Sequence, residues 1–155
     1  MKPSTIAKTL TIAAVTALVV GIGTKAKADD KGCSEASLKG AFAYTSTGFI
    51  VAAPIPALVG PQAEVGTQYF DGKGGITFSF NSSQNGAIGP GAATGKYKVE
   101  DDCTGTFTEA TPGFTAHYSF TIDKSTDHLQ AIRQDTGVVV TRTGLRQFPG
   151  DDEER

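Results

Sequence analysis

The segment "FTAHYSFTI", residues 114–122, alternates between apolar and polar side chains over most of its length. Its even-numbered residues are all apolar or aromatic: Phe114, Ala116, Tyr118, Phe120 and Ile122. Successive side chains of an extended chain point to opposite faces, so this period of two predicts a β-strand with one buried face. A helix would instead place its apolar residues three and four positions apart. The segment therefore predicts a sheet whose inner face carries large aromatic side chains.

The same alternation recurs along the chain, interrupted by turns rich in glycine, which is typical of an all-β domain. The turn "DGKGG" (71–75) predicts a hairpin, because its glycines supply the positive φ angles that tight connections need. The polar stretch 83–91 is expected to be a loop. The predicted strands are 37–45, 63–70, 76–82, 92–100, 103–110, 114–122, 128–134 and 138–148.

Short connections between consecutive strands predict a meander, and a meander of about eight strands can close into a barrel without free edges. Such a barrel has an interior wide enough for packed side chains or for one small ligand. We predict a single small antiparallel barrel over residues 29–148. A β-sandwich made from the same strands is the alternative that the order of segments leaves open.

Two segments depart from the simple pattern. The apolar stretch 49–61 contains three prolines, which remove backbone donors and make it a poor central strand. We expect it to pack across one end of the core as a plug, and a lid over a cavity mouth is the alternative. In 128–134, Leu129 and Ile132 fall on opposite faces, for which we predict a bulge.

The first 28 residues have the three regions of a secretory signal peptide. Lys2 and Lys8 give a positive start, 9–23 is apolar and uncharged, and Ala26-Lys27-Ala28 has the small-x-small pattern of a cleavage site. The apolar run is shorter than the roughly 20 residues of a spanning helix. We therefore predict cleavage after Ala28, a protein exported to the periplasm or secreted, and no transmembrane segment in the mature chain.

The full chain has a formal net charge of −2 at pH 7, and removing the signal peptide takes away four lysines. The resulting acidic domain has no basic patch for nucleic acid or for an anionic membrane surface. The end of the chain, 149–155, is expected to be a charged, solvated tail. The sequence indicates no cofactor, and it does not define an oligomeric state.

The only two cysteines, Cys33 and Cys103, are expected to form a disulfide, since exported proteins usually pair their cysteines. A nucleophilic Cys103 would need a base, and His117 and His128 are expected at the surface. Two cysteines and two histidines scattered singly also lack the spacing of a zinc site, so no metal site is predicted. The acids at 100–102 lack the pattern of a calcium loop and are expected to form a solvated turn.

Two acids and three tyrosines are the candidates for ligand contact. Glu64 shares a strand face with Gln68 and Phe70, and Glu109 shares one with Phe107. If those aromatic residues point inward, the carboxylates enter the barrel, where burial would raise their pKa values. If Tyr69 points inward instead, Glu64 is a surface residue. Three tyrosines lie on apolar or small-residue faces and are expected to be core residues that could also contact a ligand: Tyr44, Tyr97 and Tyr118.

Four blocks resemble a family of small exported bacterial proteins of unknown function, which we associate with the allene oxide cyclase-like barrel. They are "CSEASLKGAFAY" (33–44), "YFDGKGGI" (69–76), "GKYKVEDDCTGTFT" (95–108) and "IRQDTGVVVTRTGLRQ" (132–147). The resemblance spans nearly the whole mature chain and implies an exported, disulfide-linked barrel. No catalytic position of a plant allene oxide cyclase matches this chain, and a shared fold does not transfer function.

These observations favour a binding module, in which the barrel holds a small apolar ligand or presents its surface to a partner. Two alternatives remain. The first is an enzyme of the cyclase or isomerase type, in which the barrel folds a flexible substrate and an acid or tyrosine assists. The second is a structural envelope protein with a filled interior. The volume of the interior and the surroundings of Glu64 and Glu109 discriminate among them.

Overall fold

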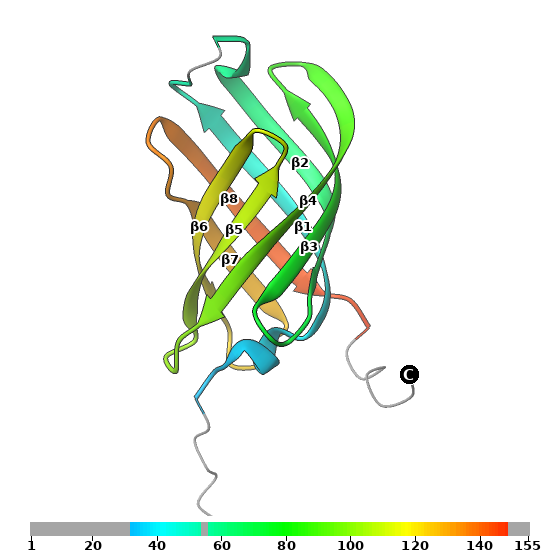
Figure 1. Ribbon diagram of the computed structural model, residues 1–155, viewed down its shortest axis with the longest axis vertical. Helices are drawn as coiled ribbons and strands as arrows, with labels where there is room; N and C mark the ends of the chain where they lie inside the picture. Colours follow the sequence, from blue (N-terminus) through cyan, green and yellow to red (C-terminus); the bar gives the residue numbers. More distant parts are fainter. Residues whose placement is uncertain (1–31, 54–55, 149–155) are drawn as a thin grey trace, which may run out of the picture. The chain divides into compact units, whose positions relative to one another are not determined.

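The computed structural model describes residues 32–53 and 56–148, and these form a closed antiparallel barrel of eight strands in chain order (Figure 1). The all-β prediction and the barrel are confirmed, and the sandwich alternative is wrong. The predicted signal peptide and charged tail lie outside the described residues. The regular elements are η1 Glu35–Leu38, β1 Gly40–Ile50, η2 Pro56–Leu58, β2 Gly60–Phe70, β3 Gly75–Gln84, β4 Ala87–Val99, β5 Thr104–Thr111, β6 Phe114–Ile122, β7 His128–Arg133 and β8 Val138–Arg146.

The barrel closes because β1 pairs with both its sequence neighbour β2 and the last strand, β8. Ser46 marks the register at this seam, since it lies opposite Glu64 on one side and opposite Arg142 on the other. Directly opposed residues share a face of the sheet. These three residues therefore all point to the interior, where each is buried.

Burial follows the predicted period of two. Along β6, every even-numbered residue from Ala116 to Ile122 is buried, whereas Phe114 at the start of the strand is half exposed. On β2, Tyr69 points outward with 48% of its surface exposed, and Gln68 and Phe70 are fully buried. This register puts Glu64 inside the barrel and resolves the alternative left open by the sequence.

The structure has regular strands at two places where the sequence predicted a loop and a bulge. The stretch 83–91 is not a loop, because β3 and β4 run on to a two-residue turn at Asn85 and Gly86, both with positive φ. Asn-Gly is the preferred pair for such a hairpin turn. There is also no bulge in β7, because Leu129, Ala131 and Arg133 alternate inward while Ile132 is exposed. The prediction failed there because it took the apolar Ile132 for an inward residue like Leu129, whereas Ile132 is exposed and Arg133 takes the inward position.

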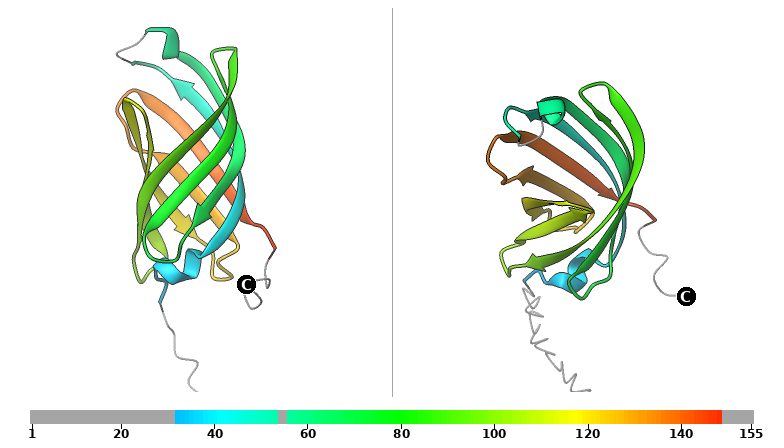
Figure 2. Two further views of the ribbon diagram at one scale, coloured as in Figure 1. Left: turned by 45° about the vertical axis from the view of Figure 1, so that its right-hand side comes forward. Right: turned by 45° about the horizontal axis from the view of Figure 1, so that its top comes forward.

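The two ends of the barrel differ. We call the end with η1 and the turns at 71–74, 100–103 and 123–127 the closed end (Figure 1). The open end has the β1–β2 connection with η2 and the turns that follow β3, β5 and β7, and Figure 2 (right) turns it toward the reader. Within the described residues, neither short helix is long and apolar enough to cross a membrane.

The closed end is sealed by the segment that precedes β1. Leu38 of η1 has no exposed surface and is part of the core cluster. The predicted disulfide is confirmed: Cys33 and Cys103 are joined, with their Cα atoms 4.9 Å apart. The Cys33 amide also donates to the Asp101 carbonyl at 3.1 Å. These bonds hold η1 across this end of the barrel. The segment that precedes β1 therefore closes the barrel. A disulfide of this kind is typical of oxidising, exported compartments.

Candidate functional site

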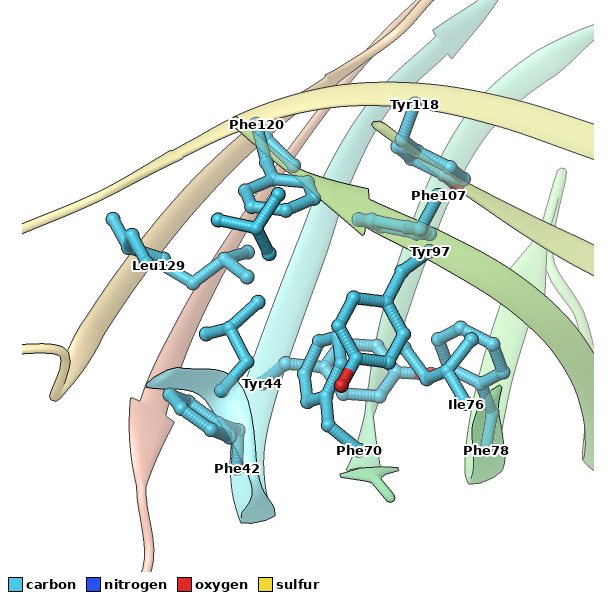
Figure 3. Close-up of a cluster of buried hydrophobic side chains, with 14 of the residues drawn as sticks. Phe42, Tyr44, Phe70, Ile76, Phe78, Tyr97, Phe107, Tyr118, Phe120 and Leu129 are labelled. Atoms are coloured by element: carbon cyan, nitrogen blue, oxygen red, sulfur yellow. The ribbon is translucent and has the colours of Figure 1, made fainter. Parts of the chain in front are cut away.

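The half of the interior nearest the closed end is filled with aromatic side chains (Figure 3). Phe70 packs edge-on against Tyr97 with ring centroids 4.9 Å apart, and Phe107 stacks on Tyr118 at 4.5 Å. Such pairs add about 0.5–1.5 kcal/mol each beyond the area they bury. This half of the barrel is therefore a packed core that leaves a ligand no room.

Tyr97 belongs to this core. Its hydroxyl donates a 2.9 Å hydrogen bond to the carbonyl of Glu35 in η1, which fixes η1 to β4. Burial raises the pKa of the Tyr97 hydroxyl. The structure thus places Tyr97 away from the cavity described next, and its role as a predicted ligand contact is not supported by this position.

The other half of the interior holds a cavity of about 440 Å³ at the open end. Ligand sites typically enclose about 300–1,000 Å³. The cavity is bounded by the barrel wall and by the β1–β2 connection, which contributes Ala52, Ala53 and Leu58. The expectation of a plug at 49–61 is thus wrong, and the described part of this segment borders a cavity as a lid would. The apolar part of the wall includes Ile50, Leu58, Phe80, Phe114, Ala116 and Val138.

Polar side chains converge on the inner part of this cavity. Four of the predicted candidates come together here: Tyr44, Glu64, Glu109 and Tyr118, although Tyr44 lies behind the cavity wall rather than on it. Both carboxylates face inward and are almost entirely buried, with 6% and 8% of their side-chain surface exposed. The polar residues of the wall include Gln62, Glu64, Glu109, Tyr118, Arg133 and Asp135.

Arg142 joins the two acids. Its Nη2 donates to Glu109 Oε2 at 2.6 Å and to Glu64 Oε1 at 3.0 Å, and its side chain has no exposed surface. Paired, hydrogen-bonded charges are the form in which ionised groups are tolerated in a protein interior. Burial opposes the charge of Arg142, but the negative groups around it outweigh burial and raise its pKa. Arg142 therefore stays cationic.

The rest of the Arg142 guanidinium lies over aromatic rings. Nε and Nη1 are buried without a hydrogen-bond partner among the described residues. The guanidinium carbon is instead 4.1 Å from the ring centroid of Tyr44 and 4.8 Å from that of Tyr118. Cation–π contacts of this kind contribute about 2 kcal/mol when desolvated. The tyrosine rings thus replace part of the hydrogen bonding that the buried cation lacks.

The tyrosine hydroxyls complete a buried polar cluster, which consists of Tyr44, Glu64, Glu109, Tyr118 and Arg142. Tyr44 donates a 2.5 Å hydrogen bond to Glu64 Oε1, and Tyr118 lies 3.5 Å from Arg142 Nη2. Burial raises the pKa of both hydroxyls, that of Tyr118 to about 12. Both hydroxyls are therefore neutral over the physiological range, with Tyr44 donating to Glu64 and Tyr118 accepting from Arg142.

Glu64 is the carboxyl whose ionisation the cluster disfavours. Desolvation is the main cause and the charge of Glu109 adds to it, so the pKa of Glu64 is raised even though Tyr44 and Arg142 act in the opposite direction. A buried acid with a raised pKa beside a cavity is the combination that general acid–base chemistry uses. The arrangement can therefore hold or transfer a proton at Glu64.

A second polar group lies nearer the mouth of the cavity. Arg133 Nε donates to Asp135 Oδ2 at 2.7 Å, and its guanidinium carbon lies 4.8 Å from the ring centroid of Phe114. His117 Nδ1 contacts Asp135 Oδ1 at 2.8 Å from the outer surface. Burial opposes ionisation of Asp135, but the hydrogen bonds from Arg133 and His117 prevail and lower its pKa. Asp135 is therefore ionised and holds Arg133 in place.

The remaining sequence predictions concern the outer surface. His117 and His128 are exposed, as expected. The acids at 100–102 form an exposed turn, in which Asp102 accepts from the amide and hydroxyl of Thr104. In the described ranges, 32–53 and 56–148, no group of three or more His, Cys, Asp or Glu residues is arranged to hold a metal ion.

Arg133 and Arg142 are the two cationic residues of this candidate site, and neither was predicted from the sequence. Their inward position could have been predicted from the alternation of side chains along each strand. Arg142 has the same parity as Val138 and Val140, and Arg133 has the same parity as Leu129. Because charged residues are almost never fully buried unless paired, an arginine at such a position predicts an interior partner.

No protein-family model matches the sequence, and no curated protein matches it. Among solved structures, the S-type phycobiliprotein lyase CPES from Guillardia theta aligns with a TM-score of 0.45 at 10% identity, covering 77% of this chain and 96% of that chain. A likeness this distant assigns neither a family nor a function. The barrel implied by the resemblance in the sequence is confirmed, and the membership of the allene oxide cyclase-like family stays a prediction.

Proposed function

We propose that the protein is an exported barrel that binds one small, mostly apolar ligand in the cavity at its open end. The observation that carries this proposal is a cavity of about 440 Å³ whose wall is largely apolar and whose inner part has buried polar groups. Binding sites for small molecules share this combination of an apolar wall and a few placed polar groups. A structural protein with a filled interior would not keep such a space.

The two halves of the interior have separate roles in this proposal. The aromatic core and the disulfide brace the closed end, and the open end has the cavity that takes the ligand. Leu58 and Phe114 border the cavity and are 38% and 49% exposed, so a ligand reaches the cavity between the β1–β2 connection and the β5–β6 turn. A preformed site of this kind loses little affinity to ordering on binding.

The test is native mass spectrometry of the protein purified from the exported fraction of its own cells, followed by extraction and analysis of bound lipids and other small molecules. We expect a stoichiometric adduct that disappears on denaturation. An independent titration with decan-1-ol, followed by NMR, should shift the amide signals of Phe80, Ala116 and Val138. Absence of both the adduct and the shifts would contradict the proposal.

Glu64 favours a second candidate function, an isomerase or cyclase that acts on the bound molecule. A protonated Glu64 beside the cavity is placed to give a proton to a bound substrate, and Tyr44 holds its carboxyl in one orientation. The extracted ligand is incubated with the wild type and with Glu64→Gln, and isomers are separated by chromatography. Conversion by the wild type alone supports the enzyme, and no conversion by either protein rejects it for that ligand.

A further inference from the structure

We propose that the ligand carries a protonated amine, which binds between the carboxylates of Glu64 and Glu109 while its apolar body fills the rest of the cavity. This inference rests on the proposed binding function and names the chemical class of the ligand.

The two acids use only part of their hydrogen-bonding capacity within the barrel. Each carboxylate accepts from Arg142 through one oxygen, Oε1 of Glu64 and Oε2 of Glu109. Glu64 Oε2 and Glu109 Oε1 accept no hydrogen bond from any described residue. An ionised carboxylate can accept about four hydrogen bonds. Each of these two carboxylates therefore has acceptor sites left over on the oxygen that Arg142 does not contact.

Gln62 adds a third acceptor on the same strand as Glu64. Gln62 lines the cavity, and its Oε1 is buried without a partner in the described part of the chain. A buried acceptor that lacks a donor costs about 1–3 kcal/mol. Three acceptors that border the cavity, on Glu64, Glu109 and Gln62, therefore lack a donor among the described residues, and an ammonium group, which has three donors and no acceptor, complements them.

The balance of charges points to the same ligand. In their ordinary ionised forms, the cluster and the mouth together have three carboxylates, Glu64, Glu109 and Asp135, but only two guanidinium groups, Arg133 and Arg142. An uncompensated charge in a protein interior is costly. In the free protein, the raised pKa of Glu64 lets a proton take the place of the missing cation. A bound amine supplies that positive charge permanently.

The cavity wall suits the organic part of such a cation. Phe80, Phe114 and Tyr118 border the cavity, and the negative faces of aromatic rings attract cations at short range. The remaining wall is mainly apolar and accepts an alkyl or aryl body. A metal ion or an inorganic cation would leave this surface without a partner, so the arrangement fits an organic amine.

Arg133 is the residue of this cavity that would favour an anionic ligand. Its Nη1 and Nη2 donate to no acceptor among the residues that the structure describes. Its charge is already offset by Asp135 at 2.7 Å, and its side chain is packed against Phe114. An anion at Arg133 would add a fourth negative charge to the interior. The excess of carboxylates therefore favours a cation, and the experiment includes an anionic probe.

The test compares three probes with the same chain length, decylamine, decan-1-ol and decanoic acid, each titrated below its micelle concentration into the wild-type protein at neutral pH. A charge-assisted hydrogen bond is stronger than a neutral one, so we expect decylamine to bind about tenfold more tightly than decan-1-ol. Decanoic acid should bind more weakly than the alcohol. Calorimetry gives the affinities, and NMR locates each probe in the barrel.

The variants Glu64→Gln and Glu109→Gln should each bring the amine affinity close to that of the alcohol. Glu100→Gln is the matched control, because it removes the same charge from an exposed side chain outside the cavity. If no probe shifts the signals of the cavity, the proposed binding function itself is contradicted. If the alcohol or the acid binds as tightly as the amine, binding stands and the amine assignment is wrong.

Discussion

Tyr44 and Glu64 are joined by a hydrogen bond of 2.5 Å in the interior of the barrel, although they lie on different strands and are 20 residues apart in sequence. The bond lies where the aromatic core ends and the cavity begins. On its core side, the Tyr44 ring meets Phe78 edge-on at 6.4 Å. On the other side, Glu64 lines the cavity. The packed half of the barrel thus orients the acid that the hollow half presents.

The first prediction concerns Arg142. Replacing it by Met removes the cation shared by Glu64 and Glu109 and leaves two buried carboxylates without it. Breaking a buried ion pair in this way typically costs about 3–5 kcal/mol of unfolding free energy. Urea denaturation of the wild type and of Arg142→Met measures the loss.

The control for this variant is Lys98→Met, which removes a cation from the exposed pair with Glu100. Exposed pairs contribute little, so this variant should unfold at nearly the wild-type urea concentration. If Arg142→Met were as stable as Lys98→Met, the central role of the buried cluster would be disproved.

The second prediction is a pH dependence of stability that reports on Glu64. Because its pKa is raised on folding, the folded state holds this proton more tightly than the unfolded chain does. The contribution of this proton to the free energy of unfolding is fully present below the pKa of Glu64 in the unfolded chain, about 4.3. It is lost as the pH rises through the pKa of Glu64 in the folded protein. Relative to the wild type, Glu64→Gln should therefore gain stability as the pH rises from about 4 to 8.

Asp102 gives a comparison of opposite sign. The hydrogen bonds from Thr104 lower the pKa of this exposed carboxyl, so its contribution is present at neutral pH and is lost as pH falls through the folded value. Asp102→Asn should therefore differ from the wild type at neutral pH and approach it in acid. Urea unfolding across the same pH series measures both variants, and equal slopes for the two would contradict the assignment of Glu64.

The sequence predicted most of the fold because the barrel wall obeys one simple rule. Strands such as 114–122, with one apolar face, need no tertiary information to be recognised. The prediction was less complete where an interior position is polar. In β7, the apolar character of Ile132 indicated an inward residue and led to the prediction of a bulge, whereas the inward position is that of Arg133.

The candidate site was predictable only in part, for a related reason. Glu64 and Tyr69 lie on opposite faces of β2, and local alternation does not say which face is inside. Pairing with β1 and β3 decides it, because it places Glu64 opposite the buried Ser46. Arg142 becomes a partner of Glu64 only when β8 closes on β1, a contact between residues 78 positions apart.

The third prediction concerns the disulfide. The bond joins residues 70 positions apart, and the chain-entropy model gives about 4 kcal/mol for a loop of this size. Cys33→Ser and Cys103→Ser should each lower the unfolding free energy by a similar amount, and the double variant should add almost nothing. Denaturation with and without a reducing agent checks this, because only the wild type should respond to reduction.

The fourth prediction separates the hollow half of the barrel from the packed half by means of two alanines. Ala116 is buried and borders the cavity, so the added carbons of Ala116→Leu enter empty space, and this variant should remain folded while losing affinity for decan-1-ol. Ala93 is buried in the core cluster and does not border the cavity, so Ala93→Leu should lose about 1–3 kcal/mol of stability through overpacking. Thermal unfolding and probe titration of both variants measure these effects. If Ala116→Leu destabilised the barrel as much as Ala93→Leu, the space beside Ala116 could not be the binding cavity.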